Sequence, residues 1–151
     1  MPLYQGLQRT ELRRAYLDAW RKMSAHQPLE PLEAQIAAVI AEHPEYLPWL
    51  ERGEDALGAE FTPEGGRENP FLHMSMHLAI RDQVGTDRPR GIARVHRVLS
   101  DRLGDAHQAE HEMMQSLGET LWEAARNGMP PDEKAYLERL ERLSRSTRRA
   151  S

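Results

Sequence analysis

Apolar residues recur along this chain at spacings of three and four, which is the period of an amphipathic α-helix. β-branched residues are sparse, and no stretch alternates between apolar and polar as a half-buried strand does. The pattern therefore predicts an all-α protein, a helical bundle of about five to six helices. The predicted helices span about residues 10–24, 31–43, 70–84, 90–103, 105–127 and 132–143.

Residues that start and stop helices support these boundaries. Asn69 and Asp105 are suited to cap a helix N-terminus, and Gly128 follows a predicted C-terminus. The stretch from about 44 to 68 is rich in glycine and proline, so we expect a long irregular loop there, helical only in part. We expect residues 1–143 to form a single bundle domain and 144–151 a flexible basic tail.

Composition narrows the function classes. The chain has 151 residues, 39% hydrophobic and 29% charged, a balance typical of one globular domain. No run approaches the roughly 20 apolar residues of a membrane span and no secretory leader is recognisable, so we expect a cytoplasmic protein without membrane association. The net charge of −4 argues against nucleic acid as a partner. Zero cysteines exclude thiolate metal sites and leave His, Asp and Glu as strong ligands.

Four of the seven histidines form two identical His-x-x-x-His pairs, His73 with His77 and His107 with His111. Positions i and i+4 of a helix lie about 40° apart around the axis and about 6 Å along it, so both imidazoles can reach one ion. Each pair continues the apolar stripe of its helix, which predicts that both pairs point toward the core.

The expected topology brings the two pairs together. One helix separates the two histidine-bearing helices, so an up-down-up bundle makes them parallel, with both pairs near the same end. His43 falls on the apolar stripe of the preceding helix and is expected at that end too. A divalent ion would resolve the cost of burying several imidazoles, and because protons compete for the same nitrogens, binding should be lost in acid.

The ligand types indicate which metal and which chemistry. Imidazole-rich coordination suits a divalent transition metal, zinc or iron first and nickel or copper as alternatives. Glu110 and Glu42 are the candidate general bases toward a metal-activated water, with Glu110 ranked first. An open coordination position would make the protein a metal-dependent hydrolase or redox protein, whereas a saturated ion would be structural or sensing. The pattern leaves open whether the protein is an enzyme.

A second hypothesis needs no metal, because paired histidines also occur as exposed or individually hydrogen-bonded helix residues. The protein would then be a non-enzymatic interaction module. It would bind a protein or RNA partner through its helical surface, the acidic stretch 51–68 and the basic tail. A homo-oligomer is also compatible with the sequence.

Segments along almost the whole chain resemble one family, bacterial proteins catalogued as domain of unknown function 1841. These segments are YLDAWRK (16–22), PLEPLEAQI (28–36), EHPEY (42–46), NPFLHMSMHLAIRDQ (69–83), DRPRGI (87–92), HQAEHEMM (107–114), LGETLWEAARNGMPPDE (117–133) and AYLERL (135–140). The resemblance implies small cytoplasmic proteins and supplies no activity. It also implies a further His directly after EHPEY, where this chain has Leu47.

Overall fold

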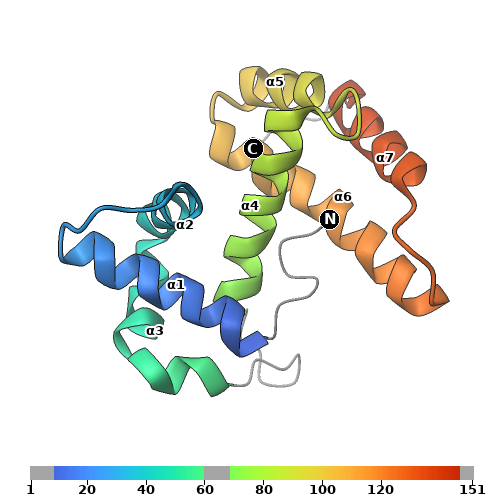
Figure 1. Cartoon of the computed structure of the whole chain (residues 1–151). Coiled ribbons are helices and arrows are strands. Elements are labelled where there is room, and N and C mark those ends of the chain that lie inside the picture. The colour runs from blue at the N-terminus through green and yellow to red at the C-terminus, as the bar shows by residue number, and fades with distance from the viewer. Residues whose placement is uncertain (1–8, 60–68, 147–151) are drawn as a thin grey trace. The chain divides into compact units, whose positions relative to one another are not determined.

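The fold is built from helices (Figure 1). The computed structural model describes residues 9–59 and 69–146, and within them every regular element is helical. The α-helices are α1 (Arg9–Ser24), α2 (Pro31–Ala41), α3 (Leu47–Glu51), α4 (Pro70–Thr86), α5 (Ile92–Leu103), α6 (Ala106–Asn127) and α7 (Glu133–Arg145). The 3₁₀ helices are η1 (Pro44–Tyr46) and η2 (Gly53–Gly58). The predicted all-α class is confirmed, and the seven α-helices of the described residues slightly exceed the expected five to six.

Short-range sequence signals set the helix ends. The Asn69 side chain accepts hydrogen bonds from the first backbone N–H groups of α4, and Asp105 and Asp132 cap α6 and α7 in the same way. Gly104 and Gly128 follow α5 and α6 in the left-handed conformation, at φ of 70° and 63°, which glycine adopts at little cost. These caps fix where the histidine-bearing first turns of α4 and α6 begin.

The stretch expected as a long irregular loop over 44–68, helical only in part, contains short helices in its described residues. It contains η1, α3 and η2 up to Gly58, and its residues 60–68 lie outside the described part of the chain. Pro44 and Pro48 stand in the first turns of η1 and α3, where their fixed φ suits a helix. Short helices therefore form despite the surrounding glycines.

The flexible tail expected over 144–151 overlaps the last residues of α7. Ser144 is buried in the last turn of α7, and the Arg102 side chain donates a hydrogen bond to its carbonyl oxygen. Helix α7 ends at Arg145, and residues 147–151 lie outside the described residues. The first two residues of the expected tail thus belong to the folded part.

The chain forms two compact units. Unit 1 ends at Leu78 and unit 2 begins at Ala79, so α4 contributes its first half to unit 1 and its second half to unit 2. The expectation of one bundle domain over 1–143 stays a prediction.

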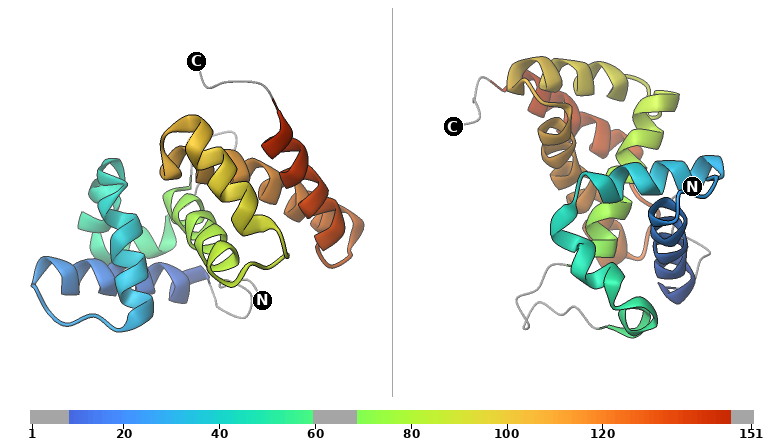
Figure 2. Two further views of the ribbon diagram at one scale, coloured as in Figure 1. Left: turned by 90° about the horizontal axis from the view of Figure 1, so that it is seen from above. Right: turned by 90° about the vertical axis from the view of Figure 1, so that its left-hand side faces the viewer.

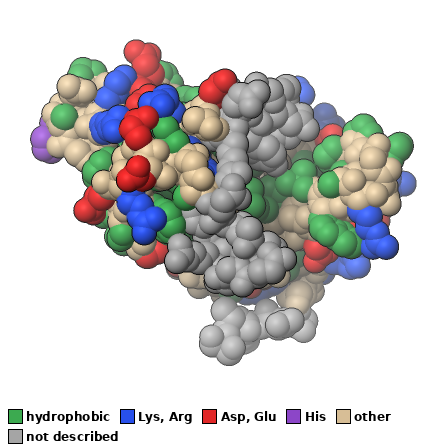
Figure 3. Space-filling model, turned by 90° about the horizontal axis from the view of Figure 1, so that it is seen from below, with side chains coloured by type: hydrophobic (Ala, Val, Ile, Leu, Met, Phe, Trp, Pro, Cys, Tyr) green, Lys and Arg blue, Asp and Glu red, His purple; other side chains and the backbone are tan. Residues whose placement is uncertain are grey.

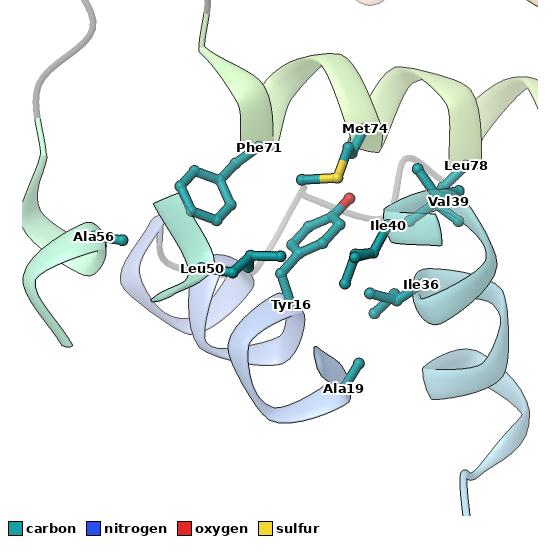
Figure 4. Packing of buried hydrophobic residues seen from close by; sticks show 10 residues of the cluster. All are labelled: Tyr16, Ala19, Ile36, Val39, Ile40, Leu50, Ala56, Phe71, Met74 and Leu78. Carbon is teal, nitrogen blue, oxygen red and sulfur yellow. The ribbon is translucent and has the colours of Figure 1, made fainter. Parts of the chain in front are cut away.

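Unit 1 has its core where α1 and α2 pack against each other, completed by α3, η2 and the first half of α4 (Figure 2, Figure 4). The buried cluster consists of Tyr16, Ala19, Ile36, Val39, Ile40, Leu50, Ala56, Phe71, Met74 and Leu78. In Figure 4 the Tyr16 ring lies at the middle of this cluster, and its hydroxyl makes a 2.8 Å hydrogen bond with that of Ser75. This core holds the start of α4 beside the end of α2.

A buried arginine joins α1 to the segment that follows α3. Arg13 is 2% exposed, and its guanidinium donates to the carbonyl oxygens of Ala56, Leu57 and Ala59 at 2.8 to 3.2 Å. The same guanidinium lies 5.0 Å from the centre of the Phe71 ring. Arg13 therefore binds three backbone carbonyl groups at and just after the end of η2.

Unit 2 is formed by α5, α6 and α7, each packed against the other two, together with the second half of α4 (Figure 2). Its buried apolar residues are Ile80, Ile92, Val95, Leu99, Ala109, Met113, Met114, Leu117, Tyr136 and Leu140. Arg139 of α7 donates to the Thr120 hydroxyl and pairs with Glu123, both on α6. These contacts hold α6 in place along much of its length.

Among the described residues, no helix is long and apolar enough to cross a membrane. On the face in Figure 3, basic and acidic side chains are interspersed over the described residues instead of gathering by sign. That face therefore shows no basic patch of the kind that nucleic-acid binding uses.

Candidate metal centre

His43 lies at the end of α2 in unit 1, where it is 1% exposed. Its Nδ1 is 2.8 Å from the carbonyl oxygen of Val39, which can only accept, so Nδ1 carries the proton. The neutral ring then has a lone pair on Nε2, the atom that can bind a metal. A ligand histidine commonly donates its other N–H to a backbone carbonyl in this way.

His73 and His77 occupy successive turns of α4, as the i, i+4 spacing predicts. Their Nε2 atoms are 3.2 Å apart and their ring centres 4.9 Å apart. His77 is fully buried and His73 is half-buried. The two Nε2 atoms thus share a hydrogen bond and lie close enough together for one ion to bind both.

The three histidines of unit 1 contact one another. The His43 ring centre lies 5.0 Å from that of His73 and 4.8 Å from that of His77. Ring nitrogens of His43 and His77 lie within 4.8 Å of each other. Unit 1 therefore brings together the two α4 histidines and the additional imidazole that the sequence suggested.

Tyr46 is a neighbour that the sequence interpretation missed. Its ring stacks on His43, with centres 5.4 Å apart, and meets the edge of His73 at 5.8 Å. The available signal was the three-residue spacing from His43 across Pro44, because side chains at i and i+3 superpose in a 3₁₀ turn.

In unit 2, His107 and His111 lie in the first turns of α6 and are both half-buried. Their ring centres are 4.5 Å apart, and ring nitrogens of the two lie within 4.8 Å of each other. Asp105 caps the helix by accepting from the His107 backbone N–H. The nitrogens of the second pair are therefore also close enough together to bind one ion.

Glu110, the first-ranked candidate base, is buried and forms a salt bridge with Arg81 of α4, also in unit 2. The Arg81 guanidinium donates to both carboxylate oxygens at 3.0 to 3.2 Å. Glu42, the second candidate, is exposed at the end of α2. The roles of these two carboxylates stay predictions, and Arg81 was not foreseen.

The structure thus contains a three-histidine group in unit 1 and a two-histidine group in unit 2. A single ion shared by both groups stays a prediction. Three neutral imidazoles are a common ligand set of catalytic zinc, which keeps a fourth position for water.

A family model described as "domain of unknown function (DUF1841)" matches residues 8–142. No curated protein and no solved structure matches the chain.

Proposed function

Since this chain belongs to the family described as domain of unknown function (DUF1841), we propose a function from its histidine geometry: it binds a divalent transition-metal ion. The observation that carries the proposal is the 3.2 Å separation of the His73 and His77 Nε2 atoms beside the buried His43 ring. His43 supports it through its tautomer, which directs a nitrogen lone pair away from Val39.

The distance between the α4 nitrogens fits coordination of one ion. Zinc binds imidazole nitrogen at about 2.0–2.1 Å, so two nitrogens at a tetrahedral angle lie about 3.3–3.4 Å apart. The observed 3.2 Å between the Nε2 atoms of His73 and His77 is close to that nitrogen–nitrogen distance. Binding would therefore require little movement of these two side chains.

We further propose that His107 and His111 are ligands of the same ion, as the repeated spacing in the sequence predicts. Arg81 follows His77 by four residues, about one helical turn, on the continuous helix α4. Its salt-bridge partner Glu110 lies between the two α6 histidines in the sequence. This salt bridge joins the first turns of α6 to the second half of α4 within unit 2.

The number of ligands decides whether the ion does chemistry. A set of three histidines leaves a position for water, and Glu110 or Glu42 would then be the candidate base. Glu110 would first have to release its hydrogen bonds from Arg81. With a fourth imidazole from α6, a tetrahedral ion is already saturated, and its role is then structural or sensing. We propose zinc or iron before nickel or copper.

The test is the metal content of protein purified without a histidine tag or chelating resin, measured by mass spectrometry. Three further samples are compared with the parent: His43→Ala, His77→Ala/His111→Ala, and the control His26→Asn. His26 is exposed at a φ of 55°, a conformation that Asn tolerates, so the control removes an imidazole outside the proposed site.

We expect about one equivalent of one metal in the parent and the control, with a large loss in the other two variants. One additional variant, His107→Ala/His111→Ala, would restrict the site to unit 1 if it kept full metal content. A metal-free parent that gains no thermal stability from zinc, iron, nickel or copper would refute metal binding. The non-enzymatic interaction module would then be the working hypothesis.

A further inference from the structure

The ring of Tyr46 covers two of the three histidines in unit 1. It is nearly parallel to the His43 ring, with 5° between the planes, and meets His73 at 74°. The Tyr46 side chain is half-buried and packs against the hydrophobic core of the unit. Metal binding by the histidines alone leaves this arrangement without an explanation.

Local sequence produces the stack. Pro44 starts the η1 turn directly after His43, and the Tyr46 N–H closes it by donating to the His43 carbonyl oxygen at 3.0 Å. A 3₁₀ turn places side chains three residues apart above one another. The backbone therefore holds the two rings in an offset parallel stack, and the core contact of Tyr46 anchors the pair.

Two contacts then fix the orientation of the His43 ring. The Val39 carbonyl oxygen holds Nδ1 at 2.8 Å, and Tyr46 holds the plane of the ring. A ring held at one nitrogen and on one face has few orientations left, so Nε2 keeps a constant direction. His43 itself lies between the end of α2 and the start of η1.

We propose that Tyr46 is a positioning residue that orients His43 for metal binding. This inference rests on the proposed function. A metal-bound imidazole is poorer in electrons than a free one, so it stacks more favourably on the electron-rich phenol ring. Removing the ring should weaken metal binding about two- to tenfold, the range expected for one aromatic pair.

The experiment compares the affinity of the parent and three variants for cobalt(II) and for zinc. Tyr46→Leu removes the aromatic ring, and Tyr46→Phe keeps the ring without its hydroxyl. Leu47→Ala is the matched control, because it removes the neighbouring side chain packed on the same core. Circular dichroism checks the helix content, and the visible spectrum of bound cobalt(II) reports its coordination geometry.

We expect Tyr46→Leu to bind both ions two- to tenfold more weakly and to alter the cobalt spectrum, while Tyr46→Phe and Leu47→Ala stay within twofold of the parent. Parent-like binding by Tyr46→Leu would overturn this inference and leave the metal site standing. Equal losses in Tyr46→Leu and Leu47→Ala would overturn it too, because they indicate general loosening of the segment. A parent that binds neither ion would overturn the proposed function itself.

Discussion

The salt bridge between Arg81 and Glu110 allows a quantitative prediction for unit 2. Three N–H···O contacts of 3.0 to 3.2 Å join the guanidinium to both carboxylate oxygens. The Glu110 side chain is 8% exposed and that of Arg81 is 28% exposed. The substitution Arg81→Leu removes the cation and leaves a carboxylate in a site that water reaches poorly.

The burial of the two groups sets the expected cost. Removing one partner from a fully buried pair costs about 3–5 kcal/mol, and an exposed pair contributes about 0–1 kcal/mol. Because Arg81 is partly solvated, we expect Arg81→Leu to lower the free energy of unfolding by about 2–3 kcal/mol. Glu110→Leu should cost less, about 1–2 kcal/mol, since water still reaches part of the remaining guanidinium.

The assay is urea unfolding of the parent, both single variants and the double variant, followed by circular dichroism with a chelator present. The double variant should lose at least about 1 kcal/mol less than the sum of the single losses, because it leaves no isolated charge. An Arg81→Leu protein within about 0.5 kcal/mol of the parent, or strictly additive losses, would refute the reasoning.

The remaining predictions concern how zinc, high pH and two glycine substitutions change the stability of the fold. Zinc at 100 times its dissociation constant should raise the free energy of unfolding by about 2.7 kcal/mol, and thermal melts should show no such gain for His77→Ala. Burial raises the pKa of Tyr16 and Tyr136 above its ordinary value. Just above the ordinary tyrosine pKa, only the unfolded chain loses these protons. The contribution of each tyrosine to folding stability is therefore full below the unfolded pKa and decreases as the pH rises from there toward the folded pKa. Urea unfolding should show a loss of up to about 1.4 kcal/mol per tyrosine at about pH 11, and Tyr136→Phe should abolish its share. Gly85→Ala, in the last turn of α4 with nothing within 4 Å of the added carbon, should raise stability by up to about 0.5 kcal/mol in the same assay. Gly128→Ala, at a φ of 63°, should lower it by about 1–2 kcal/mol; a result of opposite sign at either glycine would contradict the backbone assignment.

Local signals were sufficient to predict most helices. The long helix α6 begins after the Asp105 cap and ends at Asn127, as expected, because capping and period are properties of neighbouring residues. The turns η1 and η2 are too short to show a period. The carbonyl groups at the end of η2 are bound by Arg13, more than 40 residues earlier, and no local pattern indicates such a contact.

The sequence also predicted which histidines of unit 1 lie together, but it did not reveal the contacts of Arg81 and Tyr46. The i, i+4 spacing alone brings His73 beside His77, and the apolar stripe of α2 pointed to His43. Arg81 could not be foreseen, because its partner Glu110 lies 29 residues away and the pairing depends on how helices pack. Tyr46 required knowledge of the 3₁₀ turn after His43.

The contacts of Arg13 can form only some time after α1 has been synthesised. They reach 43 to 46 residues along the chain, and a ribosome adds about 5–20 residues per second. Helix α1 is therefore made roughly 2–9 seconds before the carbonyl groups that its arginine binds. Helix α2 is made sooner and can pack against α1 first, whereas the part of α1 that meets η2 stays uncovered during that interval.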